Sequence, residues 1–234
     1  MSSAHLHRIH QFRLQYAQEV RPPGYSGPGH IAAVVVLALA VIAAALWVAA
    51  IDWHTSHLWI VPITVLVANA VEYAAHRGPM HHRVRGLCAL HTRHSGRHHR
   101  YFTGTQMHFE STADFHAVLF PPVLLLFFGG ITVALGCMAA LCLPRAAAAL
   151  FVATGVGYYL VYEVLHFLYH VPPSWRLGRL PGVCWLAKLH RLHHEPARMQ
   201  QGNFNLVFPL CDWLAGTLDT GDGMAHAARA QHSD

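Results

Sequence analysis

The stretch AAAALFVATGVGYYLVYEVLHFLYH, residues 146–170, joins a long apolar run directly to two histidines. The apolar part, residues 146–165, is long enough to cross a bilayer, which takes about 20 helical residues. Glu163 lies near its end, and His166 and His170 follow at helical spacing. The stretch therefore predicts a membrane helix that presents a carboxylate and two imidazoles at one membrane surface.

Three further apolar runs accompany it, at about residues 31–51, 58–75 and within 117–143. The third contains Pro121-Pro122 and Gly129-Gly130, so the sequence leaves open one tilted or kinked helix or a re-entrant pair. The chain is 54% hydrophobic and 12% charged, whereas soluble domains carry about 25% charged residues. We therefore predict an all-α integral membrane protein with about four transmembrane helices.

The positive charges are distributed unevenly between the connections. With four spans, the N-terminus, the loop at residues 76–116 and the tail after residue 165 share one side. Of the 16 lysines and arginines, only Arg145 lies on the other side. Because cytoplasmic loops carry an excess of positive charge, both termini of this multi-pass protein are expected in the cytoplasm. The alanine-rich spans favour a bacterial inner membrane, although an internal eukaryotic membrane would give the same orientation. The modest net charge of +5 gives no reason to expect nucleic-acid binding.

Histidine is the most unusual feature of the composition, with 22 residues against 16 lysines and arginines together. The histidines avoid the four apolar runs and gather where the second and fourth runs end. Ordinary packing residues have no reason to be excluded from some segments and concentrated in others. Four clusters contain the ten candidate metal ligands: His76 and His81; His94, His98 and His99; His166 and His170; and His190, His193 and His194.

The spacing within these clusters predicts which imidazoles converge, because residues three or four apart share one face of a helix. This applies to His166 with His170, to His94 with His98, and to His190 with both His193 and His194. His76 and His81 are five apart and do not align on an ideal helix. Gly78 and Pro79 lie between them, so the backbone is expected to leave helical geometry there.

The number of imidazoles bears on the kind of metal site. Ten exceed the four ligands of a tetrahedral zinc ion and suit two ions with open positions. We therefore expect a cytoplasmic helical cap that carries a histidine-rich dimetal site. Imidazole binds iron, copper, nickel and zinc alike, so the spacing alone does not select iron. His91 shares a face with His94 and His98, which leaves open whether it is a ligand or supports one.

Three carboxylates are candidates for orienting these ligands. Glu72 precedes His76 by four residues, and Glu163 precedes His166 by three. A metal-bound imidazole usually donates its other N–H to a carboxylate or a carbonyl. We expect Glu72 and Glu163 to have this role, with Asp212 a weaker candidate. The alternative is that Glu72 and Glu163 are interfacial charges at helix ends.

The clusters and the segment after them resemble the fatty acid hydroxylase superfamily, also called the sterol desaturase family. The resemblance covers about residues 60–217. The matching segments are EYAAHR from Glu72 with His81, HSGRHHRYFT from His94, YEVLHFLYH from Tyr162, LHRLHHE from Leu189, and the ending Asn203-Phe204-Asn205, Pro209, Asp212 and Gly216-Thr217. Two positions depart from the family pattern: Asn205 stands where glycine is common and Ala215 where an aromatic is common. Both lie outside the histidine clusters, so they concern the substrate pocket more than metal binding.

The resemblance implies an enzyme, an O2-dependent di-iron oxidoreductase. The ten histidines would hold two iron ions, and the substrate hydroxylated would be lipid-like, such as a fatty acyl chain, a sterol or an isoprenoid. No fused cytochrome b5 domain is expected, so a separate ferredoxin, cytochrome b5 or reductase would deliver the electrons. The chain then divides into a cytoplasmic N-terminal segment at residues 1–29, a hydroxylase-like membrane domain at 30–217 and a flexible C-terminal tail at 218–234.

Several other functions compete with this interpretation. A lipid desaturase would use the same di-iron site, and ligand spacing does not separate the two reactions. A haem-binding electron carrier places paired axial histidines inside its spans, and here the spans hold none. A metal transporter needs polar groups along a path through the bilayer, of which the spans offer little beyond Asn69. A non-catalytic metal-binding relative is disfavoured because all ten histidines are present.

Overall fold

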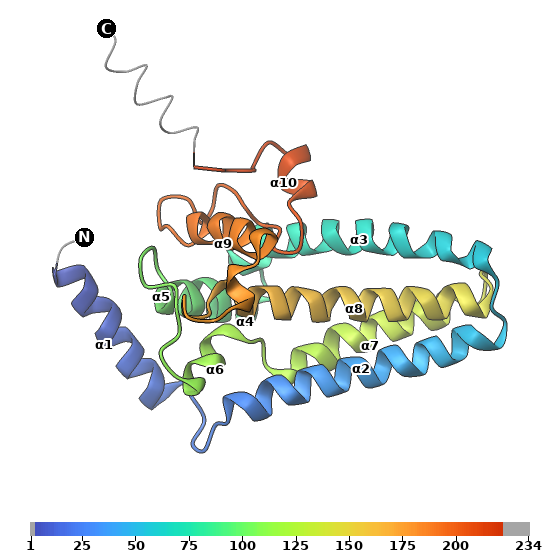
Figure 1. The fold of residues 1–234 in the computed structure, drawn as a ribbon, viewed down its shortest axis with the longest axis horizontal. Helices are drawn as coiled ribbons and strands as arrows, with labels where there is room; N and C mark the ends of the chain where they lie inside the picture. Colours follow the sequence, from blue (N-terminus) through green and yellow to red (C-terminus); the bar gives the residue numbers. More distant parts are fainter. Residues whose placement is uncertain (1–2, 222–234) are drawn as a thin grey trace, which may run out of the picture. The chain divides into compact units, whose positions relative to one another are not determined.

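The computed structural model describes residues 3–221, which form helices and connecting loops without a β-strand. Most of the tail predicted at 218–234 lies outside this range. The all-α prediction is confirmed. Four helical stretches are long and apolar enough to cross a membrane: α2 (Gly27–Ile51), the continuous stretch Thr55–Met80 that contains α3 (Ile60–Ala75), α7 (Pro122–Ala139) and α8 (Arg145–Tyr169) (Figure 1).

The third apolar run forms one spanning helix rather than a re-entrant pair. Pro121 caps α7 and Pro122 occupies its first turn, where a missing N–H and a fixed φ are compatible with a helix. Gly129 and Gly130 lie inside α7 without breaking it. The residues just before it form the separate short helix α6 (Phe115–Val118).

The chain folds into two compact units that interleave along the sequence. One unit contains Ser26–Val71 and Leu119–Val164. The other contains the residues up to Tyr25, Glu72–Val118, and the residues from Leu165 onward. Both α3 and α8 therefore begin in the first of these units and end in the second.

The first of these units consists mainly of membrane-type helices that pack through small residues. Its core contains Val34 and Ala38 of α2 together with Leu125 of α7 and Val156 of α8. A Cβ on Gly136 would lie 2.3 Å from a methyl group of Val152, so only glycine allows this contact between α7 and α8. Large apolar side chains cover the outside of these helices, as expected for surfaces that face lipid.

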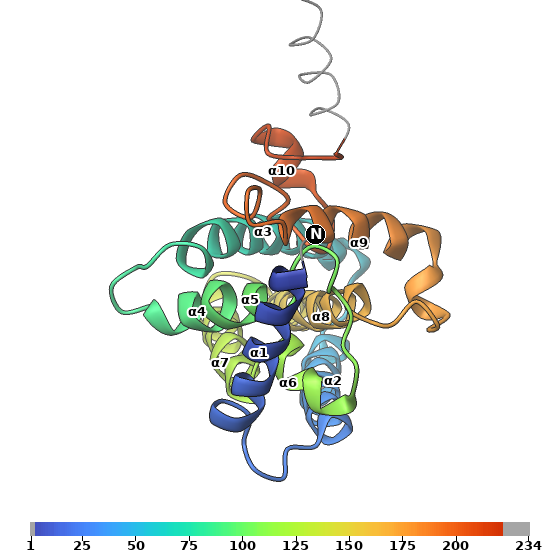
Figure 2. The ribbon, with the colours of Figure 1, turned by 90° about the vertical axis from the view of Figure 1, so that its left-hand side faces the viewer.

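The second unit holds all ten candidate ligands. Its further elements are α1 (Ser3–Glu19), the π-helix η2 (His76–Met80), α4 (Cys88–Arg93), the π-helix η3 (His94–His98), α5 (His99–Tyr101), η4 (Thr112–Asp114), η5 (Leu177–Arg179), α9 (Pro181–His193) and α10 (Leu210–Leu214). Helix α1, which was predicted only as part of a cytoplasmic N-terminal segment, lies across α5 (Figure 2). Ile9 and Tyr16 of α1 are buried, and Tyr16 packs edge-on against Tyr101.

Candidate metal centre

The ten histidines selected from the sequence lie in two groups of five. In each group, one ring nitrogen per residue lies within 4.8 Å of all the others, and all ten side chains are buried. The first group is His76, His81, His94, His99 and His193, and the second group is His98, His166, His170, His190 and His194. The groups are neighbours, because the rings of His99 and His194 stack with centroids 4.1 Å apart.

Two π-helical turns explain which residues share a group. Within η3 the amide of His99 donates to the carbonyl of His94, so residues five apart line up along the wide turn. His94 and His99 accordingly belong to the first group. His94 and His98 face the same way, as the spacing predicts, with stacked rings whose centroids are 5.4 Å apart, but they belong to different groups. The π-turn η2 places His76 and His81, also five apart, in the first group and bears out the predicted departure from an ideal helix.

The end of α9 contributes to both groups. His190 and His194, four residues apart, lie in the second group, and His193 lies in the first. Consecutive residues on a helix point about 100° apart, so His193 and His194 diverge toward different groups. His190 lies beside both of them, as expected, with ring centroids 4.4 Å from His194 and 6.1 Å from His193, but only His194 shares its group. His166 near the end of α8 and His170 just after this helix share the second group, as the spacing predicts.

Backbone carbonyls fix the orientation of five of these imidazoles. The hydrogen bonds run from Nδ1 of His76 to Phe204 (2.5 Å), of His193 to Gly202 (2.8 Å), of His98 to Ala117 (2.9 Å), of His170 to Met107 (2.7 Å) and of His194 to Phe102 (2.6 Å). A carbonyl oxygen only accepts, so each Nδ1 carries the proton and each Nε2 presents a bare lone pair.

These lone pairs face one another, and the donor set therefore fits metal ions. The Nε2 atoms of His98 and His194 are 3.2 Å apart, and neither carries a proton to donate. In the first group, the Ser95 hydroxyl donates to the Met80 carbonyl and so accepts from Nδ1 of His81. Nε2 of His81 is then also bare, 3.0 Å from that of His193. A shared cation turns this repulsion into coordination, and imidazole suits first-row transition metals.

Burial keeps these imidazoles in the form that binds metal. Loss of hydration lowers the pKa of His193 to about 4 and that of His81 to about 2. It also lowers the pKa of His98 and of His194 well below the usual 6.5, with neighbouring histidines adding to the effect. Neutral imidazole is the ligand form, so no proton has to leave before a metal binds.

The three carboxylates bind backbone and hydroxyl donors. Glu72 accepts from the amides of Leu206 and Val207. Asp212 accepts from the amides of Phe204 (3.0 Å) and Asn205 (2.7 Å) and from the Thr217 hydroxyl (2.7 Å). Both carboxylates thus hold the segment whose Phe204 carbonyl orients His76. In the other unit, Glu163 accepts from the Phe120 amide and the Tyr159 hydroxyl.

Sequence reasoning did not find the five carbonyl acceptors, because any residue carries a carbonyl and no side-chain pattern marks it. Ser95 offered a weak signal, since it lies between two candidate ligands. His91, whose role the sequence left open, is outside both groups. It lines a cavity of about 310 Å³ together with Tyr16 of α1 and Arg97 of η3.

Comparison with known proteins identifies the family and the fold. The family model for fatty acid hydroxylase matches residues 61–217. A solved structure described as full-length Scs7p, with only its hydroxylase domain visible, has a TM-score of 0.61 and 23% identity, covering 80% of this chain. The match spans 65% of that protein, so the likeness concerns the fold. No curated protein sequence matches the chain significantly. By the family match, which extends over most of its length, the chain belongs to the fatty acid hydroxylase family.

Proposed function

We propose that this protein is a membrane-bound di-iron oxygenase that hydroxylates a lipid-like substrate. The substrate class is a fatty acyl chain, a sterol or an isoprenoid. The observation that carries the proposal is the pair of five-imidazole groups, in which bare Nε2 atoms face one another. The ten histidines are the proposed ligands, five to each ion.

The donor set favours iron in this family context. Structural zinc takes four ligands in a closed tetrahedron, whereas five nitrogens around an octahedral ion leave one position open. When bound, iron would supply the activation of O2 that hydroxylation of an unactivated C–H bond requires. One oxygen atom enters the C–H bond and the other leaves as water, which takes two electrons from a separate donor and two protons from the solvent. That donor is a ferredoxin, a cytochrome b5 or a reductase.

The chain's own residues hold the ligands and exclude water. The carbonyls of Phe204, Gly202, Ala117, Met107 and Phe102 keep the Nδ1 protons in place, so the Nε2 atoms stay available for metal. The rings of Phe102 and Phe204 are fully buried and pack against histidines of the second and first groups, respectively. A dry site of this kind protects an oxidising reaction from water.

The membrane helices supply the route for the substrate. The site follows the ends of α3 and α8, both of which are apolar enough to span a bilayer. The positive charges on that side favour a cytoplasmic site, where a soluble electron donor can reach it.

Metal content and product analysis test the proposal together. The full-length protein is purified in mild detergent, reconstituted anaerobically with ferrous iron and analysed by mass spectrometry, alongside His166→Ala and His193→Ala. We expect about two irons in the wild type and fewer in each variant. When O2, a chemical reductant and membrane lipid are then supplied to the iron-loaded wild type, we expect a product lipid that gains one oxygen atom. A product that only loses two hydrogens would make the enzyme a desaturase. Absence of metal from the reconstituted wild type would contradict the proposal.

A further inference from the structure

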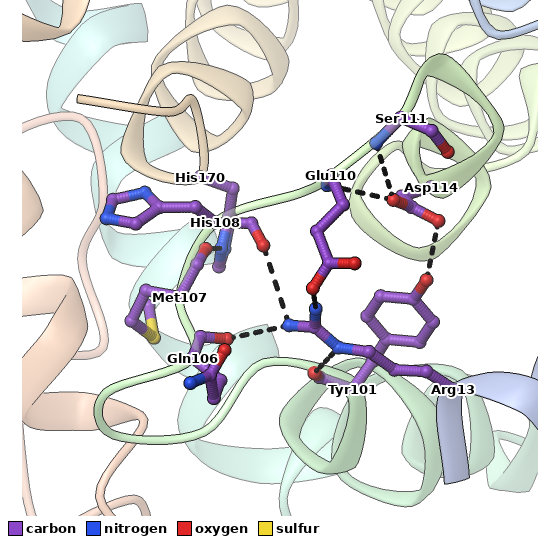
Figure 3. A network of polar contacts seen from close by, with 9 residues as sticks. All are labelled: Arg13, Tyr101, Gln106, Met107, His108, Glu110, Ser111, Asp114 and His170. Carbon is purple, nitrogen blue, oxygen red and sulfur yellow. Dashed lines mark hydrogen bonds and ion pairs between the residues drawn. The ribbon is translucent and has the colours of Figure 1, made fainter. Parts of the chain in front are cut away.

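Arg13 of α1 is a buried charge that connects the N-terminal helix to one loop of the site. Its side chain is only 9% exposed. The guanidinium donates from Nε to the Tyr101 carbonyl (3.1 Å) and from Nη2 to the Gln106 carbonyl (3.0 Å). Nη1 forms an ion pair with Glu110 (2.7 Å). Figure 3 shows this fork reaching into the loop from Tyr101 to Glu110.

A second carboxylate fixes the same loop from its far end. The Tyr101 hydroxyl donates to Asp114 (2.6 Å), whose other oxygen accepts from the amides of Glu110 (2.9 Å) and Ser111 (2.8 Å). The loop is therefore held at its start by Tyr101, in its middle by Arg13 and at its end by Asp114 (Figure 3).

This loop carries two of the carbonyls that orient the second histidine group. Phe102 accepts from His194, and Met107 accepts from His170. The bonds from Arg13 go to the carbonyls of Tyr101 and Gln106, the residues immediately before these two acceptors. Holding one peptide unit leaves only the φ and ψ of a single residue to vary before the next carbonyl, so the bonds from Arg13 restrict where both acceptor carbonyls can point.

The next turn of α1 supports the third carbonyl of the second group. The Tyr16 hydroxyl hydrogen bonds with the His116 ring (2.7 Å) and with the His116 carbonyl (3.1 Å). The following residue, Ala117, accepts from His98. The first group has other supports: its acceptors Gly202 and Phe204 belong to the C-terminal segment, which Asp212 and Glu72 hold.

We propose that Arg13 is a positioning residue for the second histidine group, and that α1 is thereby a working part of the metal centre. The inference rests on the proposed metal binding and deepens it. Without the hydrogen bonds from the Arg13 guanidinium, the Phe102 and Met107 carbonyls are less restricted, so the rings of His194 and His170 lose their fixed orientation. Loss of an outer partner of a metal-bound imidazole typically lowers metal affinity about 10–100-fold. The first group keeps its own carbonyls and its own metal.

Metal binding to full-length Arg13 variants tests this selectivity. Iron per chain is measured at a series of buffered ferrous concentrations in the wild type, Arg13→Ala, Arg13→Lys and Arg8→Ala. Arg8 is an exposed arginine of the same helix, so its variant controls for lost charge. At the same ferrous concentration, we expect the wild type and Arg8→Ala to hold two irons and Arg13→Ala to hold one. In Arg13→Ala, the iron affinity of the second group should be at least about tenfold lower than in the wild type. Arg13→Lys keeps the charge but not the planar fork, so it should also weaken that site.

Double variants identify which iron is lost. Combined with His193→Ala, which removes a first-group ligand, Arg13→Ala should leave no iron. Combined with His170→Ala, a second-group ligand, it should leave one, because both changes affect the same metal. Thermal unfolding of each metal-free variant checks that the chain is folded, and Arg13→Lys serves if Arg13→Ala does not fold.

The outcomes separate this inference from the proposed function. A wild type without metal contradicts the proposed function itself. A wild type with two irons and Arg13 variants that also bind two with unchanged affinity overturn the role of Arg13 alone. Two results would assign α1 a general structural role and overturn the claim that Arg13 acts on the second group alone. One is the loss of both irons in Arg13→Lys, and the other is the loss of the remaining iron when Arg13→Ala is added to His170→Ala.

Discussion

The two histidine groups have the same side chains and the same burial, but different parts of the chain support them. The first group relies on carbonyls of the C-terminal segment, which two buried carboxylates, Glu72 and Asp212, hold through its amides. The second group relies on carbonyls of the 101–117 region, which Arg13 and Tyr16 of α1 hold. Mutations far apart in the sequence should therefore affect the two proposed metal sites separately.

The largest expected effect comes from Asp212, the counterpart of Arg13 for the first group. Asp212→Ala leaves the amides of Phe204 and Asn205 and the Thr217 hydroxyl without their acceptor. Each buried donor left unsatisfied costs about 1–3 kcal/mol, so we expect a loss of about 3–5 kcal/mol in the free energy of unfolding. The first group should lose its metal and the second should keep one.

Chemical denaturation and metal analysis measure both effects of Asp212→Ala. Asp212→Asn is the matched control, since its amide oxygen still accepts and its shape is unchanged, and it should lose less stability than the alanine variant. Two tightly bound metals in Asp212→Ala would show that the C-terminal segment does not support the first group, and the comparison between the two supports would fail.

A smaller effect is expected from Gly202, whose carbonyl orients His193. A Cβ at this position would lie 2.1 Å from the Thr217 carbonyl oxygen, so Gly202→Ala forces the two backbone segments apart. Overpacking of this kind costs about 1–3 kcal/mol, and the displaced carbonyl should weaken the first metal site. In α9, a Cβ on Gly182 meets nothing within 4 Å, so Gly182→Ala is the control. Equal metal affinity and equal melting temperature in the two variants would contradict the prediction.

The features of the two groups that can be predicted from the sequence are those marked by particular types of side chain. Long apolar runs locate the spans, and imidazoles crowded at their ends mark the candidate ligands. Gly78 and Pro79 indicate a departure from the α-helix between His76 and His81, and the structure has a π-helix there. The same argument missed η3, because Ser95-Gly96-Arg97 carries no comparable break and a π-turn differs from an α-turn by a single residue.

The supports of the two groups could be predicted only in part. Asp212 and Glu72 are acidic residues in otherwise apolar surroundings, which makes them noticeable. The acceptors they hold are backbone carbonyls, which no residue type identifies. Arg13 lies among polar residues of an N-terminal segment, and in the sequence nothing distinguishes it from the other positive charges expected on the cytoplasmic side. Its role depends on contacts with residues about 90 positions away, and one sequence contains no record of such contacts.

The smallest effect concerns what the two groups share. Burial lowers histidine pKa values in both groups, so acid should affect the two groups alike. The mutations above, in contrast, affect one group and not the other. His193 shows in which direction stability changes with pH. Its pKa is about 4 in the folded chain and about 6.5 in the unfolded chain, so the unfolded state binds protons first as the pH falls and becomes more favourable. His193 alone should make the free energy of unfolding of the metal-free protein decrease by about 1 kcal/mol between pH 6.5 and 5.5, and its contribution should be nearly constant at pH 8. Thermal unfolding from pH 8 to 5 in mild detergent, with the metal-loaded protein as control, measures this. If the melting temperature of the metal-free protein does not change with pH, the imidazoles without metal are hydrated rather than buried. If the loaded protein loses one metal at a much higher pH than the other, the supports of each group, and not burial alone, determine its resistance to acid.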